Sequence, residues 1–127
     1  IPLQVSAPFH TSMLRPASEK LAQELERVEM RDFRIPVISN VIADYIEKKE
    51  LIKEFLKKQV MYPILWTRCI VRMLQEGVDT FVEIGPGKVL SGFLKKIDTN
   101  LVISNVEDLK SLNNTLTILE NCVCQGV

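Results

Sequence analysis

The only histidine of the chain, His10, is the side chain best suited to acid–base chemistry, because an imidazole exchanges a proton near neutral pH. It follows Ser-Ala-Pro-Phe at 6–9, and a proline–aromatic turn after an extended run would fix the direction of the ring. No Gly-x-Ser-x-Gly nucleophile motif occurs in the 127 residues. His10 is therefore half of a catalytic pair or a structural histidine, and a lone histidine in a small domain is more often structural.

Two other features could carry chemistry. Cys69 could be a nucleophile paired with His10, but its place on an apolar helical stripe beside Met73 predicts a buried, inert thiol. The segment Gly-Pro-Gly-Lys at 85–88 could cradle a phosphate between a strand and a helix. It lacks the spacing of a P-loop or of a dinucleotide fingerprint, so we interpret it as a tight structural turn. No group of side chains has metal-ligand spacing.

The composition indicates a globular domain, with 46% hydrophobic and 25% charged residues. Because 16 basic residues balance 16 acidic ones, we expect no general affinity for nucleic acid or for anionic membranes. Apolar runs are too short to span a bilayer. Three cysteines without a pairing pattern favour reduced thiols in a cytosolic-type compartment. The start Ile-Pro-Leu, without methionine or leader, leads us to expect a piece of something longer.

Hydrophobic periodicity predicts short strands alternating with amphipathic helices, which is typical of an α/β layer on a mostly parallel sheet. The predicted strands are residues 3–5, 37–41, 80–84 and 101–103. The predicted helices are residues 14–28, 51–59, 66–74, 89–97 and 109–123, with their apolar stripes in the core. We expect Pro16 in the first turn of the first helix and Gly77 as a left-handed cap.

Gln59 continues the apolar stripe of the predicted helix 51–59, because it lies four residues beyond Phe55. Burying its amide without a partner would cost about 1–3 kcal/mol. Either this end of the helix lies near solvent or the site is polar for a reason.

Several blocks together resemble the malonyl-CoA:acyl-carrier-protein transacylases of fatty-acid synthesis and the related acyltransferase domains of polyketide synthases. The blocks are Ser-Ala-Pro-Phe-His at 6–10, Pro-Val-Ile-Ser-Asn-Val at 36–41, the helix end at Gln59, and residues 77–90 with Glu-Ile-Gly-Pro-Gly-Lys-Val-Leu. They agree in residue type, order and separation from His10 to about Ile97. From Asp98 onward the likeness is one of general character.

The resemblance implies a partial α/β-hydrolase-like three-layer domain with a mostly parallel sheet. Residues 1–127 would be the C-terminal portion of the large subdomain, and residues 1–5 the strand that returns from a small ferredoxin-like subdomain. The chain would lack nearly all of that small subdomain. It would also lack the N-terminal part, with its oxyanion glutamine, its Gly-His-Ser-x-Gly nucleophile and its carboxylate-binding arginine.

The implied activity is ping-pong transfer of malonyl from coenzyme A, used as a thioester substrate, to the phosphopantetheine thiol of acyl carrier protein, without a cofactor or metal. His10 matches the base, and Gln59 matches a position whose main-chain carbonyl orients the imidazole. Phe9 matches a position associated with preference for malonyl over methylmalonyl. The expected partners are malonyl-CoA, acyl carrier protein and the missing N-terminal portion, without nucleic acid or membrane.

We expect this acyltransferase in a bacterial cytoplasm or an organelle of bacterial descent, and we expect the chain to be inactive alone because it lacks the nucleophile. The alternative, from another class, is a non-catalytic α/β protein-interaction module in which His10 is structural. A module of that kind would be a compact monomer without an exposed apolar patch, whereas a piece of a larger sheet would expose one.

Overall fold

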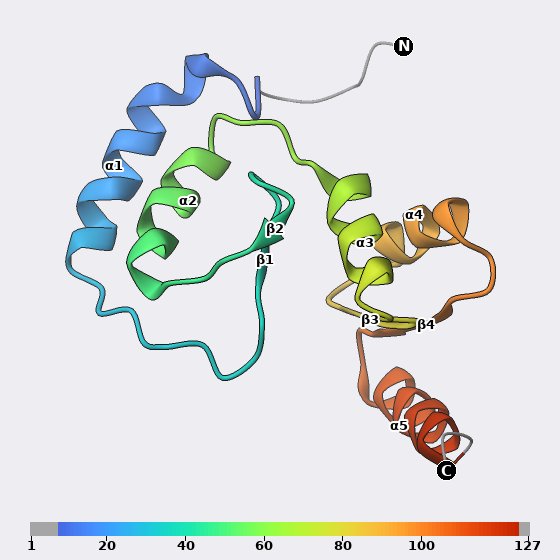
Figure 1. Cartoon of the computed structure of the whole chain (residues 1–127). Helices are drawn as coiled ribbons and strands as arrows, with labels where there is room; N and C mark the ends of the chain where they lie inside the picture. Colours follow the sequence, from blue (N-terminus) through green and yellow to red (C-terminus); the bar gives the residue numbers. More distant parts are fainter. Residues whose placement is uncertain (1–7, 125–127) are drawn as a thin grey trace. The chain divides into compact units, whose positions relative to one another are not determined.

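The computed structural model describes residues 8–124, and the chain divides into two compact units, residues 1–72 and 73–127 (Figure 1). The first unit contains an antiparallel hairpin and the second a parallel pair of strands. The parallel pair confirms the predicted α/β class, and the hairpin was not predicted. The strand predicted at residues 3–5 lies outside the described residues.

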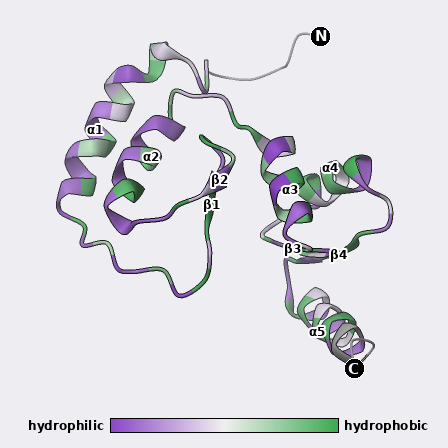
Figure 2. Cartoon of the chain, in the orientation of Figure 1, coloured by the Kyte–Doolittle hydropathy of each residue, from purple (hydrophilic) through white to green (hydrophobic). Residues whose placement is uncertain are grey.

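Two helices of the first unit lie side by side (Figure 1). A short 3-10 turn at Ser12–Leu14 leads into α1 (Arg15–Glu26), and another at Lys49–Leu51 leads into α2 (Ile52–Gln59). Pro16 occupies the first turn of α1, as predicted, where its missing N–H costs no helical hydrogen bond. Most of α1 is hydrophilic (Figure 2), which fits a helix that lies at the surface.

The hairpin consists of β1 (Ile38–Ser39) and β2 (Asp44–Tyr45). The strand predicted at residues 37–41 is wrong at its C-terminal end, because the chain turns after Ser39. Ala43 adopts a left-handed φ of 56°, and its N–H donates to the Ser39 carbonyl at 2.8 Å. This turn contains no glycine, so the usual sequence signal of a hairpin is missing.

Helix α3 (Trp66–Gln75) begins in the first unit and ends in the second. At its C-terminal end Gly77 has a φ of 83°, and the N–H of Val78 donates to the Met73 carbonyl at 3.1 Å. These are the features of a Schellman cap, so the predicted left-handed cap is confirmed.

The second unit places one helix over each face of its two-stranded sheet (Figure 1). Its elements are β3 (Thr80–Ile84), α4 (Val89–Ile97), β4 (Val102–Val106) and α5 (Leu109–Cys124). Glu83 and Ser104 point to opposite faces of the parallel pair, because Ser104 lies beside Val82 in the register. Glu83 bonds to α4 and Ser104 to α5, so the two helices cover opposite faces.

Strand β4 extends three residues beyond its predicted end at Ile103. Ser104 and Asn105 resemble loop residues in the sequence, but both side chains have partners in the fold. The Ser104 hydroxyl lies 2.6 Å from that of Thr115, and the Asn105 amide donates to the Gly87 carbonyl at 3.5 Å. Tertiary contacts therefore override the local preference for a loop.

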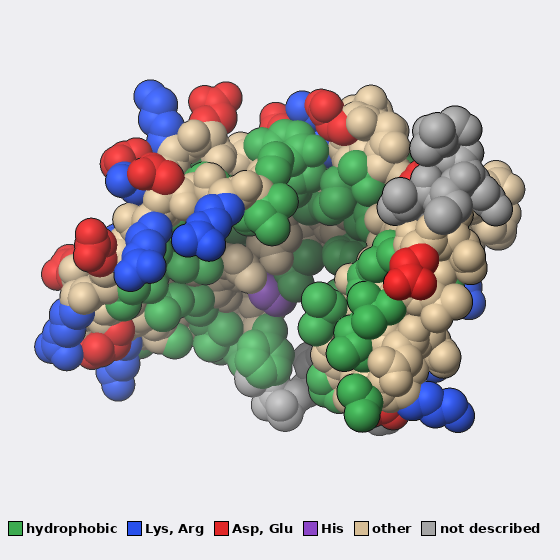
Figure 3. Space-filling model, turned by 90° about the horizontal axis from the view of Figure 1, so that it is seen from below, with side chains coloured by type: hydrophobic (Ala, Val, Ile, Leu, Met, Phe, Trp, Pro, Cys, Tyr) green, Lys and Arg blue, Asp and Glu red, His purple; other side chains and the backbone are tan. Residues whose placement is uncertain are grey.

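The apolar stripes predicted as core in α4 and α5 are only partly covered within the described residues. Leu94 is buried, whereas six other members of the stripes are exposed. They are Val89, Leu90 and Phe93 on α4, and Leu109, Leu112 and Leu116 on α5. Hydrophobic side chains gather at the surface of each unit (Figure 3). The prediction that these stripes are buried is wrong here, because a sheet of two strands offers too little surface to cover them.

Candidate active site around His10

His10 lies in a tight turn before α1, and its backbone is left-handed with a φ of 59°. The Thr11 hydroxyl donates to the Pro8 carbonyl at 2.8 Å and closes this turn. A residue other than glycine in this conformation costs of order 1–3 kcal/mol, so surrounding contacts must hold it. The proline–aromatic turn that the sequence suggested is present, and it directs the imidazole toward α2.

The structure brings His10 and Gln59 together, although they are 49 residues apart in sequence. Nδ1 of His10 lies 3.0 Å from the main-chain oxygen of Gln59, the last residue of α2. A carbonyl oxygen can only accept a hydrogen bond, so Nδ1 carries the proton in a neutral ring. The lone pair is then on Nε2, which is the atom free to act as a base.

Pro63 explains why the Gln59 carbonyl is available. In a continuing α-helix this carbonyl would accept from the N–H four residues later, and that residue is a proline without an N–H. The last turn of α2 is already irregular, because the N–H groups of Met61 and Tyr62 both donate to the Lys58 carbonyl at 3.0 Å. The end of the helix thus leaves an unused acceptor, and His10 occupies it.

Phe9 and the Gln59 side chain lie at the surface around this contact. Phe9 is 56% exposed, and Gln59 is exposed at the helix end, so the first of the two sequence-based interpretations of Gln59 applies. A cavity of about 280 Å³ beside Gln59 separates α2 from the hairpin, and none of its lining residues is charged. The Asn40 Oδ1 atom is buried at this cavity and has no hydrogen-bond partner among the described residues.

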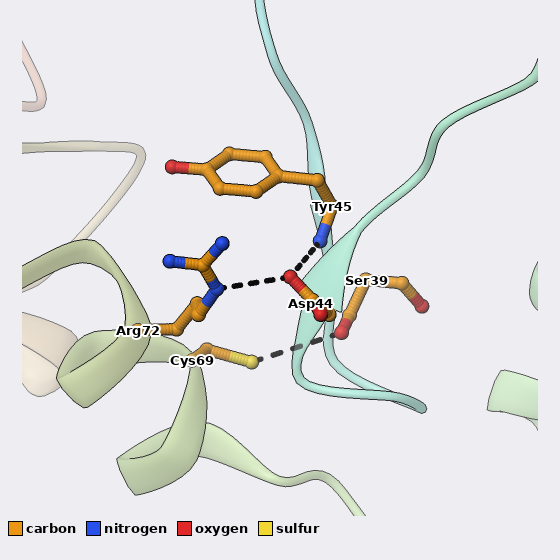
Figure 4. Close-up of polar contacts among 5 residues, drawn as sticks. All are labelled: Ser39, Asp44, Tyr45, Cys69 and Arg72. Atoms are coloured by element: carbon orange, nitrogen blue, oxygen red, sulfur yellow. Dashed lines mark hydrogen bonds and ion pairs between the residues drawn. The ribbon is translucent and has the colours of Figure 1, made fainter. Parts of the chain in front are cut away.

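A polar cluster joins the hairpin to α3 within the first unit (Figure 4). The Tyr45 N–H donates to Asp44 Oδ1 at 2.8 Å and Arg72 Nε donates to the same atom at 3.0 Å, which together hold the pKa of Asp44 below its usual value. The Arg72 guanidinium also lies 5.2 Å from the centre of the Tyr45 ring. These contacts fix the hairpin that lines the cavity.

Cys69 belongs to the same region and does not fit the role of a nucleophile. The thiol is buried, and its Sγ lies 3.8 Å from the Ser39 carbonyl (Figure 4). Burial raises the pKa of Cys69, which disfavours the reactive thiolate. The interpretation of Cys69 as an inert thiol is therefore supported.

The glycine-rich junction at residues 85–88 is occupied by the chain's own carboxylates. Glu83 accepts the N–H groups of Leu90 at 3.0 Å and Ser91 at 2.8 Å, and Glu107 accepts the Gly87 N–H at 3.0 Å. Hydrogen bonds from the Ser91 hydroxyl and from the N–H groups of Ser91 and Leu90 lower the pKa of Glu83. A phosphate would meet negative charge here instead of free N–H groups, which supports the interpretation as a structural turn.

Across the part of the chain that the structure describes, no three His, Cys, Asp or Glu residues come together as metal ligands. The helices within residues 8–124 include none that is long and apolar enough to cross a membrane.

The sequence is similar to curated proteins over most of its length. It is 43% identical over 120 residues to the malonyl CoA-acyl carrier protein transacylase of Bacillus subtilis, and 38% identical over 112 residues to that of Staphylococcus aureus. The first alignment covers 94% of this chain and 38% of the relative, and the second 88% and 36%. No family model matches the chain.

Solved structures give the same result for the fold. The malonyl CoA-acyl carrier protein transacylase of Clostridium perfringens aligns with a TM-score of 0.90 and 49% identity, over 98% of this chain and 40% of the other. The enzyme from Streptococcus pneumoniae aligns with a TM-score of 0.86 and 48% identity, over 92% and 38%. The chain is similar to part of a malonyl CoA-acyl carrier protein transacylase.

The likeness to the transacylases covers the elements that hold His10 and Gln59, since the alignments span most of the chain. It does not by itself assign a role to either residue. The sequence did not reveal the second strand of the hairpin, the Glu83 contacts or the hydrogen bond from Ser18 to the Lys57 carbonyl of α2. Each of these joins residues that are distant in sequence or lacks a local motif, so no signal in the sequence could have shown it.

Proposed function

We propose that this chain carries the general base of a malonyl transferase. The proposed reaction moves malonyl from coenzyme A to the phosphopantetheine thiol of acyl carrier protein. The observation that carries the proposal is the bond from His10 Nδ1 to the Gln59 carbonyl, because it leaves Nε2 free as a base. The names of the relatives support the choice of substrates, and one similar structure is a malonyl-transacylase in complex with its acyl-carrier protein.

The first half-reaction would start at a serine of the portion that the relatives have beyond this chain. His10 Nε2 takes the serine proton as the hydroxyl oxygen attacks the thioester carbonyl. The bond from carbonyl carbon to sulfur then breaks, and the proton passes from His10 to the departing coenzyme A sulfur. The product is malonyl-serine, and His10 is neutral again.

The second half-reaction reverses the order of these proton transfers. His10 takes the proton of the phosphopantetheine thiol, and the sulfur attacks the malonyl-serine ester. The serine oxygen leaves with the proton from His10, so the base returns to its starting state. Throughout, the Gln59 carbonyl accepts from Nδ1–H and holds the ring, which is the part that an aspartate plays in a Ser-His-Asp triad.

The proposed reaction requires a serine nucleophile that this chain does not supply. The chain spans 38% of the Bacillus subtilis relative, and its sequence contains no Gly-x-Ser-x-Gly motif. We therefore propose that it does not turn over alone and that the whole protein uses no cofactor beyond the coenzyme A thioester. A bacterial cytoplasm, or an organelle of bacterial descent, is the proposed location.

The rival proposal, a self-standing interaction module, is supported less well. It requires the apolar residues of the sheet and its helices to be covered within the chain. Ile84 at the end of β3 is 82% exposed, and Leu109 at the start of α5 is 73% exposed. Exposure of this extent at strand and helix ends favours a piece of a larger α/β layer.

Intact mass spectrometry after incubation with malonyl-CoA tests the proposed function. The chain is mixed with a polypeptide that supplies the remaining portion of such a transferase, and each piece is also tested alone. We expect malonyl on the added piece only when both are present, and loss of that adduct with His10→Ala. Met13→Ala, which removes an exposed side chain three residues away, is the matched control and should leave the adduct unchanged.

Two results would overturn the proposed function. A malonyl adduct on this chain alone would place the nucleophile here. An undiminished adduct with His10→Ala would remove the histidine from the mechanism.

A further inference from the structure

Ser18 is the one buried residue of α1, all of which the structure describes. Its side chain is 0% exposed, and its hydroxyl donates to the Lys57 carbonyl at 2.9 Å. A hydroxyl in such a place must be hydrogen-bonded, because a buried polar group without a partner is costly. The partner here is not a side chain but the end of the neighbouring helix α2.

Lys57 and Gln59 both lie in the last turn of α2, and both carbonyls are bound from the same segment. The Lys57 carbonyl would accept from the Met61 N–H in a regular helix, but that N–H donates to Lys58 instead. Ser18 bonds to the first of these carbonyls and His10 to the second. The segment from 10 to 18 is therefore hydrogen-bonded to the C-terminal end of α2 at two carbonyls.

The two hydrogen bonds to the end of α2 differ in their exposure to solvent. The bond from His10 to the Gln59 carbonyl is exposed, so solvent weakens its hold on the turn before α1. The Ser18 hydroxyl is buried between α1 and α2, and its bond to the Lys57 carbonyl is partly buried, so water competes less for this bond than for the exposed His10 contact. It sets how α1 lies on the last turn of α2, and hence where the chain before α1 places the ring.

We propose that Ser18 is a positioning residue for His10. Its hydroxyl anchors α1 to the end of α2, so that the Gln59 carbonyl stays within reach of Nδ1 and the proton stays on that nitrogen. Ser18 touches neither substrate nor reacting atoms, and it acts only through the imidazole. The inference rests on the proposed function only in taking His10 as the base.

The competing explanation is that Ser18 is merely small. A small side chain lets two helices approach closely, and alanine would serve equally well for that purpose. The two explanations differ in what Ser18→Ala does to the histidine ring, since the substitution keeps the small size and removes the donor.

Long-range 1H–15N correlation spectra of the 15N-labelled chain test this directly. His10 is the only histidine, so every imidazole signal belongs to one ring. At alkaline pH the wild-type ring should give two well-separated 15N signals, a protonated type for Nδ1 and an unprotonated type for Nε2. With Ser18→Ala the two signals should move toward each other as the tautomers mix. Ser12→Ala, an exposed serine closer to His10, is the matched control and should change neither signal.

Backbone amide spectra of α1 and α2 show whether each variant is folded. A folded Ser18→Ala chain with wild-type ring signals would overturn the proposal. Should that variant fail to fold, Ser18→Cys decides, because it keeps a small side chain with a hydrogen-bond donor that is much weaker than a hydroxyl. Ring signals between those of a locked and a mixed tautomer are then expected, and wild-type signals would refute the role. The spectra need no acyl transfer, so a failure of the proposed function would appear separately, as transfer that survives His10→Ala.

Discussion

The position of one proton, on Nδ1 of His10, decides what the imidazole can do. The Gln59 carbonyl fixes that proton, and the left-handed turn at His10 aims the ring at the carbonyl. The turn is strained by about 1 kcal/mol or more, so the backbone would relax if the ring contact were absent. The hydrogen bond and the strained turn therefore depend on each other.

Phe9 directly precedes the proposed base His10, and its substitution is expected to change substrate selectivity. In the enzyme completed with the portion that the relatives have, Phe9→Ser should relax the preference for malonyl over methylmalonyl by roughly tenfold or more, because a ring that crowds one methyl group contributes about 1–3 kcal/mol. The measurement is the ratio of kcat/KM for the two substrates. Met13→Ser, at a more exposed apolar residue of the same segment, should leave the ratio unchanged. An unaltered ratio with Phe9→Ser would contradict the role.

The candidate site could be predicted only in part from the residues themselves. His10 stands out as a lone titratable side chain, and Pro63 shows that the Gln59 carbonyl lacks its helical partner. That the two meet could not be predicted, because the contact spans 49 residues and depends on how α1 lies against α2. The family resemblance suggested that His10 and Gln59 meet, and in the structure His10 Nδ1 lies 3.0 Å from the Gln59 main-chain oxygen. Ser18 carried no signal at all, since serine within a hydrophilic helix is ordinarily exposed.

Carboxylate side chains accept hydrogen bonds from backbone N–H groups at the N-terminal ends of two helices. Helix α4 begins over the Glu83 carboxylate, and Asp108 directly precedes α5, where its carboxylate accepts the Ser111 N–H at 2.7 Å. These bonds lower the pKa of both carboxyl groups. A lowered pKa in the folded state means that the contribution to stability is present at neutral pH and is lost as pH falls through the folded value.

The Ser91 amide proton should report the titration of Glu83. Because this N–H donates to the carboxylate, its chemical shift should change with a midpoint below 4.5, the ordinary value for glutamate. Glu83→Gln should remove that titration, lower the urea midpoint at neutral pH, and flatten the acid side of the stability profile. Glu120→Gln, at an exposed glutamate on α5, should do none of these. A Ser91 midpoint at or above 4.5 would contradict the sign of the shift.

Strongly periodic elements of this fold were predictable, and elements made by tertiary pairing were not. The bounds of β3 and α4 agree with the sequence pattern, since alternation and an i, i+3, i+4 stripe are local properties. Strand β4 was predicted too short because Ser104 and Asn105 look like loop residues until their partners are known. The hairpin strand β2 has only two residues and a turn without glycine, so it leaves no recognisable pattern.

For the whole molecule, the informative property is apolar surface that the chain does not cover. Within the described residues, β3 and β4 pair only with each other, so each strand has an unpaired edge. A shallow groove of about 440 Å³ beside them is lined by Ile84, Leu109 and Leu112, among others. Parallel strands are normally buried on both faces and extended on both sides. The relatives are more than twice as long as this chain, which leaves ample further chain to cover the groove.

We expect the isolated chain to bind a hydrophobic dye and to self-associate, and we expect the remaining portion of such a transferase to suppress both. Covering one large aliphatic side chain contributes roughly 1.5–3 kcal/mol. Replacing both Ile84 and Leu109 with lysine should therefore weaken association with the added portion by about a hundredfold or more. Ile35→Lys, at an equally exposed residue of the first unit, is the control and should have a much smaller effect. Titration of the dye signal with the added portion measures the strength of association for the unchanged chain, the double variant and Ile35→Lys. A compact monomer without dye binding would instead mean that the apolar groove needs no cover, and the interaction module would become the better description of the chain.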